Sequence, residues 1–120
     1  SNARDDQLIS VAAAGLVSVE TLADSFTAAP NSEFTIPFTL RREPAVRGFP
    51  VKVELIVPLH VKGILTIPTQ LAPGQSTGTL KIKTATALGP LNAPFKIHAS
   101  TATGPRYVGE MEIELVAPLN

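Results

Sequence analysis

The chain has 120 residues, and its ten Lys and Arg balance its ten Asp and Glu, so its formal net charge at pH 7 is zero. A neutral chain has no overall field to attract nucleic acid or an anionic membrane, so neither partner is expected. Cysteine is absent, which excludes disulfides and thiolate metal sites, and the length fits one domain with a single self-sufficient core.

The N-terminal segment indicates how much of the chain takes part in the fold. Ser1 to Ala3 resemble the remnant of a cleaved tag, so we expect residues 4–120 to form one domain trimmed from a longer protein. The longest apolar run, Leu8 to Val19, is interrupted by polar residues and is shorter than the ~20 residues of a membrane-spanning helix. Membrane insertion is therefore not expected, and this run predicts one broken strand or two short ones.

Prolines and glycines, eleven and eight in number, separate segments rich in Val, Ile and Thr, as is typical of an all-β domain. Glu33 to Arg42 alternates strictly and predicts a half-buried strand. Its apolar face comprises Phe34, Ile36, Phe38 and Leu40.

Further alternating segments follow, and a weaker strand is predicted from Val61 to Ile67. The alternating segments are Val51–Val57, Gly78–Thr84, Phe95–Ser100 and Glu110–Leu115. Turn signals between the strands are Ala29-Pro30-Asn31, Gly48-Phe49-Pro50, Pro73-Gly74, Gly89-Pro90 and Gly104-Pro105. The pattern predicts an antiparallel two-sheet sandwich of about seven strands. No long run has helical periodicity, and only Ala85 to Ala93 has room for a helical turn.

Pro37 lies inside the strand predicted from Glu33 to Arg42. Proline has no N–H to donate, so that side of the strand must face solvent, an edge or a bulge. We therefore expect Pro37 to mark the place where the first strand leaves its neighbour.

The stretch Gly74-Gln-Ser-Thr-Gly78 looks at first like a phosphate-binding loop. Such a loop needs four residues between its glycines, a following lysine, and a helix that begins at the loop. This stretch has three residues between the glycines and no lysine, and an alternating segment follows it. We interpret it as a turn between strands.

The side chains that could bind a metal do not form a recognisable ligand set. His60 and His98 are far apart, and neither has a second ligand at the usual spacing. Glu110, Glu112 and Glu114 form a row on one strand face, but calcium prefers six to eight oxygens that converge from bent loops. We interpret the row as a solvated face paired with Lys96 and His98 across a hairpin, and we expect no metal and no cofactor.

Few side chains are available for catalysis or for sugar binding. A nucleophile needs an oriented base, and His98 opposite the glutamates is the only conceivable one, so we expect no enzymatic activity. A carbohydrate-binding module is the alternative, but such modules stack sugars on exposed aromatic rings, and this chain has no Trp and one Tyr. Tyr107 and Phe49, with Phe26 as a further possibility, are the aromatic residues left for ligand contact once the core positions are assigned.

The segments FTIPFTLRRE, GFPVKVEL, LTIPTQLAPGQSTGTLKIKTA and APFKIHASTATG, in this order, resemble immunoglobulin-like sandwich repeats of large secreted bacterial proteins. In that pattern an arginine closes the second strand, as Arg41 and Arg42 do here, and a GQ-S-x-G-T-L turn leads into the fifth. The resemblance covers about residues 33–103. It implies an immunoglobulin-like sandwich whose first strand pairs with one sheet and then crosses to the other, for which Gly15 would suit the break.

The resemblance also implies an extracellular or cell-envelope location, and it indicates fold more than activity. The antibody-type cysteine pair and core tryptophan are missing, so antigen-receptor-like recognition is not expected. The leading hypothesis is a non-catalytic accessory domain of a larger secreted or cell-surface protein, either a spacer or a protein-interaction module. Its partners would be the neighbouring domains of the parent chain, or a protein or glycan at the cell surface.

Strand parity gives one geometric expectation. Each connection in an antiparallel sandwich reverses the chain, so an odd number of strands places the two ends at opposite poles. Leu8 and Val116 are therefore expected at opposite ends of a body about 30 Å long, both exposed, with no enclosed polar pocket around His98.

Overall fold

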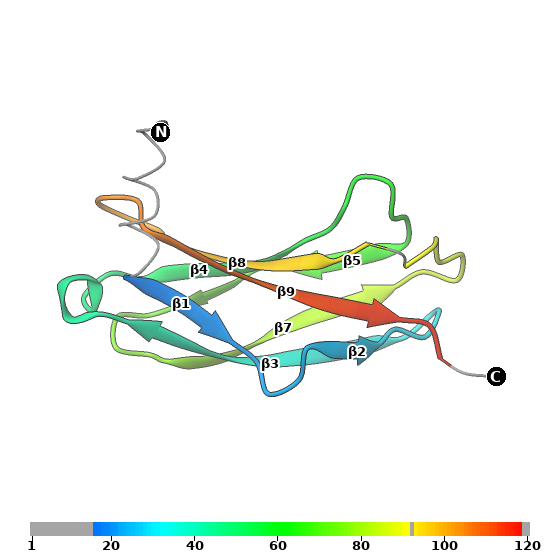
Figure 1. Ribbon diagram of the computed structural model, residues 1–120, viewed down its shortest axis with the longest axis horizontal. Helices are drawn as coiled ribbons and strands as arrows, with labels where there is room; N and C mark the ends of the chain where they lie inside the picture. Colours follow the sequence, from blue (N-terminus) through cyan, green and yellow to red (C-terminus); the bar gives the residue numbers. More distant parts are fainter. Residues whose placement is uncertain (1–15, 92, 119–120) are drawn as a thin grey trace, which may run out of the picture.

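A computed structural model describes residues 16–91 and 93–118, and it shows two β-sheets packed face to face (Figure 1). Nine strands and one short 3₁₀-helix occur within these residues. The elements are β1 (Val17–Glu20), β2 (Ser25–Thr27), β3 (Glu33–Arg42), η1 (Pro44–Val46), β4 (Val51–Ile56), β5 (Ile64–Ile67), β6 (Thr69–Leu71), β7 (Thr77–Thr84), β8 (Phe95–Thr101) and β9 (Val108–Val116).

One sheet has the strand order β1-β3-β7-β5 and the other β2-β9-β8-β4-β6. With the seven passes of an immunoglobulin-like sandwich lettered A to G along the chain, these orders correspond to A-B-E-D and A-G-F-C-D. The predicted all-β, immunoglobulin-like two-sheet sandwich is therefore confirmed. The sheets are antiparallel except for β2, which pairs in parallel with β9, so the expectation of purely antiparallel sheets is wrong at that edge.

The expected count of about seven strands is also wrong, because two passes of the chain change sheets midway. Glu20 pairs with Thr39 of β3, whereas Ser25 pairs with Glu114 of β9, so the first pass crosses between them. The crossing that the resemblance implies is thus present in the segment 21–24. Gly15, the residue expected to allow it, lies outside the described residues.

The second crossing takes place at a proline. Ile67 pairs with Lys81 of β7, while Thr69 pairs with Val53 of β4, and Pro68 alone separates them. Since β1 and β2 run in one direction and β5 and β6 in another, the nine strands make seven passes of the chain (Figure 1). The two crossings connect the edges of one sheet to the edges of the other and so close both sides of the sandwich.

The alternating segments become strands with the predicted faces inward. Glu33–Arg42 is β3 as predicted, and the other strong segments agree to within two residues at each end. The core combines the inward faces of both sheets, including Ile36, Phe38, Leu40, Val51, Val53, Leu55, Leu80, Ile82, Phe95, Ile97, Ile113 and Leu115.

Two weaker predictions need correction. The strand predicted from Val61 starts only at Ile64, because Val61 closes a turn in which its N–H bonds to the carbonyl of Pro58. Within 85–94, none of the described residues is helical. Of the first predicted strand, residues 8–15 lie outside the described residues, and residues 17–20 form β1.

Pro37 lies where the first strand ends, as expected. The N–H of Leu40 donates to the carbonyl of Ser76, the residue just before β7. Because backbone groups alternate in direction along a strand, the even-numbered residues of β3 direct theirs toward β7 and the odd-numbered residues toward β1. The pairing with β1 stops at Thr39. The missing N–H of Pro37 therefore faces a position that β1 no longer occupies.

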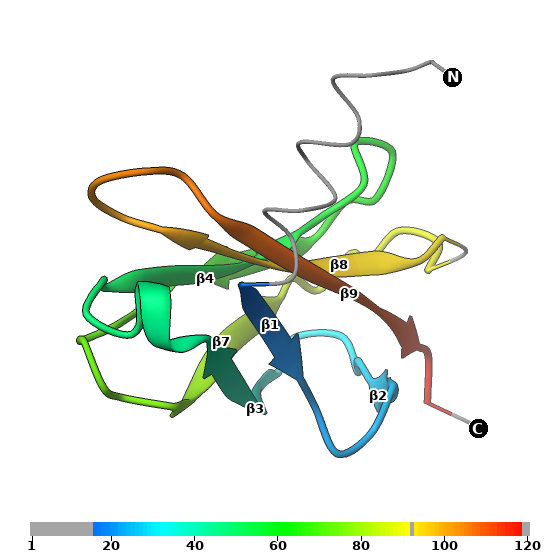
Figure 2. The same ribbon diagram turned by 60° about the vertical axis from the view of Figure 1, so that its left-hand side comes forward.

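The two ends of the sandwich differ in the loops that they carry. We call the end where β1 begins the entry pole; it carries the loops 43–50, 72–76 and 102–107 (Figures 1 and 2). The end where β9 stops is the exit pole. The chain thus enters the described fold at one end of the long axis and leaves it at the other, as the seven passes require.

Candidate functional site

The turn at Ala72–Gln75 is built from its own residues and from one arginine. Gln75 donates its N–H to the carbonyl of Ala72 at 3.0 Å, and Gly74 between them has a φ of 83°, a left-handed conformation that favours glycine. Proline followed by such a glycine is the pattern of a type II turn. The turn interpretation of this stretch agrees with the structure.

Arg42 stabilises this turn with two hydrogen bonds from its buried side chain. Its Nη1 donates to the carbonyl of Gln75 at 2.9 Å and its Nη2 to that of Ala72 at 3.0 Å. The side chain is buried, and burial lowers the pKa of Arg42. The arginine and the GQ turn, the two motifs behind the family resemblance, are thus in direct contact and serve to hold the loop.

Phe49 and Tyr107, the two candidate ligand contacts, lie in neighbouring loops of the entry pole. Both are half-buried and pack against the core. A Cβ placed on Gly104 would lie 2.9 Å from the ring of Phe49, so the loop 102–107 rests closely on that ring. The backbone N–H of Tyr107 bonds to Oγ1 of Thr101. Both rings support these loops, and their contact with a ligand remains a prediction.

The third remaining aromatic residue, Phe26, lies on β2 far along the chain from that pair. It is half-buried and packs against the core. Its neighbour in the parallel pairing is Leu115 of β9. The structure therefore does not bring Phe26 into the same cluster as the loop aromatics.

The glutamate row on β9 is paired with cations only at its first member. Nδ1 of His98 lies 2.8 Å from Oε2 of Glu110, and Nζ of Lys96 lies 3.9 Å from Oε1 of the same glutamate. Lys96 is opposite Glu112 in the strand register, yet its ammonium group lies near Glu110. The predicted pairing across the hairpin is thus confirmed for Glu110, while Glu112 makes no ion pair with another described residue.

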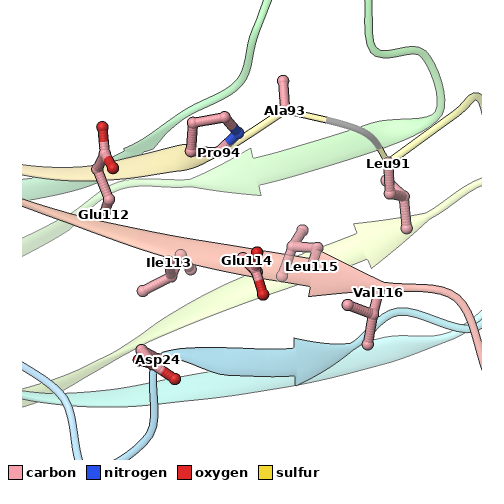
Figure 3. A pocket seen from close by; sticks show the side chains of 9 residues that line it. All are labelled: Asp24, Leu91, Ala93, Pro94, Glu112, Ile113, Glu114, Leu115 and Val116. Carbon is pink, nitrogen blue, oxygen red and sulfur yellow. The ribbon is translucent and has the colours of Figure 1, made fainter.

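The second half of the row borders an open groove of about 620 Å³ (Figure 3). The groove follows the end of β9, with Leu91, Ala93 and Pro94 on one side and Asp24, just before β2, on the other. Three carboxylates line it, those of Asp24, Glu112 and Glu114. The other side chains in its wall are Leu91, Ala93, Pro94, Ile113, Leu115 and Val116.

Backbone hydrogen bonds hold Asp24 and the adjoining β2 against β9. The N–H of Glu114 donates to the carbonyl of Asp24 at 2.8 Å, and that of Ala28 donates to Val116 at 2.8 Å. Both bonds belong to the parallel pairing of β2 with β9. Asp24 was not among the residues singled out in the sequence, because no local pattern links residue 24 to residue 114. The one available signal was a glutamate row with too few opposing cations.

The described residues contain no helix long and apolar enough to cross a membrane.

Within residues 16–91 and 93–118, no three side chains of His, Cys, Asp or Glu converge in a way that could hold a metal ion. His98 and His60 lie on different elements, one within β8 and the other in the loop between β4 and β5.

Comparison with known protein families found no family model that matches the chain, and comparison with curated proteins found no matching sequence.

Proposed function

We propose that the protein is a non-catalytic spacer module of a larger exported chain, which holds its neighbouring domains apart at a fixed separation. The observation that carries this proposal is the position of the entry and exit points. The described fold begins with β1 at one pole and ends with β9 at the other (Figure 1). A module connected in this way adds its own length to a chain of domains.

The length that it would add follows from its strands. β9 has nine residues, and at ~3.3 Å per residue it extends for about 30 Å along the axis of the sandwich. A flexible Gly/Ser linker of comparable residue number has a root-mean-square length of about 60 Å but a broad distribution of lengths. The folded module would thus contribute a short, well-defined separation.

The pairing of the terminal strands also suits a module under tension. β2 is close to the chain entry and runs parallel to β9, the last strand. A force that pulls the two poles apart would slide β2 and β9 past each other, so their backbone hydrogen bonds would resist it together. The mechanical load would therefore fall on a ladder of bonds within the folded sheet.

Two labels on the full chain test the separation. Because the chain contains no cysteine, Ser18→Cys with Ala117→Cys gives a single defined pair of attachment points. Single-molecule energy transfer should show one narrow population near 30 Å in buffer and a broad one in urea. A distance near 10 Å, the spacing of two stacked sheets, or a broad distribution under native conditions would contradict the spacer proposal.

A replacement experiment separates spacing from specific interaction. An unrelated rigid sandwich of the same span, placed at this position in the parent protein, should preserve the parent's activity if spacing is the function. A Gly/Ser linker of equal residue number should reduce it. If both replacements abolish the activity, the surface of this module is required, and the function is that of a protein-interaction module.

A further inference from the structure

The carboxylates of the groove at the end of β9 differ from others on the sheet faces because, among the described residues, none of them has a Lys, Arg or His nitrogen within 4.0 Å. Four other glutamates of the two outer faces lie within 4.0 Å of a Lys, Arg or His nitrogen, namely Glu20, Glu33, Glu54 and Glu110. Asp24, Glu112 and Glu114 form no ion pair with another described residue. Lys96 is opposite Glu112 in the strand register, but its ammonium group lies near Glu110, so the groove is a local concentration of negative charge.

The spacing of these carboxylates distinguishes between possible cationic partners. Glu112 and Glu114 project from the same face of a flat strand, ~7 Å apart, and Asp24 immediately precedes the neighbouring strand β2. Calcium needs six to eight oxygens that converge on a single point, which this arrangement does not supply. In an extended peptide, however, alternate side chains also repeat at ~7 Å. Cationic residues at alternate positions would therefore match the spacing of the two glutamates.

The groove also has an apolar end. Leu91 and Val116 lie at the end nearer the exit pole, and Glu112 lies at the opposite end (Figure 3). Val116 is 39% exposed, which leaves apolar surface that a bound side chain could cover. Leu91 is held in place by its packing against the core.

We propose that this groove binds an extended segment of another protein that carries Lys or Arg at alternate positions, followed by an apolar side chain seated between Leu91 and Val116. The cationic groups lie over Glu112 and Glu114, within reach of Asp24. The site is distinct from the spacer role, since it uses the side of the sandwich along β9.

The test uses the full chain and two synthetic peptides of one composition. The alternating peptide, Lys-Ser-Lys-Ser-Val, places both Lys and the Val on one face of an extended chain, and the block peptide, Lys-Lys-Ser-Ser-Val, places its two Lys on opposite faces; both have capped ends. Binding is followed by amide chemical shifts at low ionic strength and again at 0.15 M salt. The alternating peptide should bind more tightly than the block peptide, shift the signals of Leu91 and Val116, and weaken as salt is added.

Substitutions locate the site. Glu112→Gln together with Glu114→Gln should weaken binding by about fivefold for each partly shielded ion pair removed. The matched control, Glu20→Gln with Glu33→Gln, removes the same charge from the other sheet and should leave the affinity unchanged. Val116→Thr keeps the shape but removes apolar surface, and it should weaken the alternating peptide more than the block peptide.

The proposal is overturned if the two peptides bind equally, if neither binds, or if the control pair weakens binding as much as the groove pair. Saturable competition by millimolar calcium would identify a divalent cation as the occupant instead. Self-association of the free protein that is lost with Glu112→Gln and Glu114→Gln would identify a second copy. None of these results bears on the distance between the poles, so the spacer proposal is tested separately.

Discussion

Replacing Phe38 by alanine should remove one of the largest packing contributions in the core. Phe38 lies in the middle of β3, is 3% exposed and is directed inward. Truncating a buried Phe to Ala costs ~3 to 5 kcal/mol, because apolar contact is lost and a cavity remains. For a domain of this size the melting temperature should fall by roughly 4 °C for each kcal/mol. Since whole domains have about 5 to 15 kcal/mol of stability, this loss is about a fifth or more of the total.

The opposite strand supplies a matched second variant. Gly78 of β7 lies opposite Phe38, and a Cβ placed on it would be 3.0 Å from Cζ of Phe38 and 3.0 Å from Cδ2 of Leu71. Gly78→Ala alone should therefore cost about 1 to 3 kcal/mol through overpacking. In the Phe38→Ala background the added methyl group enters the cavity, so its cost should be reduced or reversed.

Urea denaturation of the four proteins in this cycle gives the coupling energy directly. We expect the two changes to be non-additive by more than about 0.5 kcal/mol. A loss of less than about 1 kcal/mol for Phe38→Ala would show that the ring is not a core anchor. Additivity within about 0.3 kcal/mol would show that Gly78 and Phe38 are not in the close contact described above.

Three further predictions concern the turn, the carboxylates and the loop aromatics. Arg42→Met keeps the apolar stem but loses two hydrogen bonds to the 72–75 turn. The free energy of unfolding, measured in urea, should therefore fall by about 1 to 3 kcal/mol, and amide exchange in that turn should become faster. A gain in stability would mean that burying the charge costs more than its hydrogen bonds contribute. Calcium at millimolar concentration, compared with a chelator, should leave the melting temperature unchanged, because the glutamates of β9 do not converge; a rise of several degrees would contradict this. If the glycan-binding alternative holds, calorimetric titration will detect polysaccharide binding that Tyr107→Ala abolishes, and the absence of binding across a panel of polysaccharides would remove that alternative.

Local sequence pattern was enough to predict the five strongly alternating strands and the faces that they bury. Side chains alternate across a strand with a period of two, so the row Phe34, Ile36, Phe38 and Leu40 determines which side of β3 is inward without reference to any other segment. The same reasoning explains why Pro73 and Gly74 were recognised as a turn. Proline and a left-handed glycine are requirements of the backbone over four residues, and they do not depend on the rest of the fold.

The family resemblance implied that the first strand changes sheets, but only the tertiary structure showed the second change, at Pro68. The segment from Ile64 to Leu71 contains a proline, but nothing in it specifies that Ile67 pairs with β7 and Thr69 with β4. Strand pairing depends on partners that are far away in the chain, and the pattern of one segment carries no information about them. For this reason the count of about seven described the passes of the chain, while the structure contains nine strands in its described residues.

The residues of the candidate groove were likewise identified in part from the sequence and in part only from the tertiary structure. The sequence revealed the glutamate row on β9, because residues two apart on a strand share a face. It did not reveal that Lys96 lies near Glu110, or that Asp24, just before β2, is brought to the row by the hydrogen bond from the N–H of Glu114 to its carbonyl. The charge of each side chain is a property of the sequence. Whether that charge is compensated depends on which groups the folded sheets bring within a few ångströms of it, and only the three-dimensional arrangement determines that.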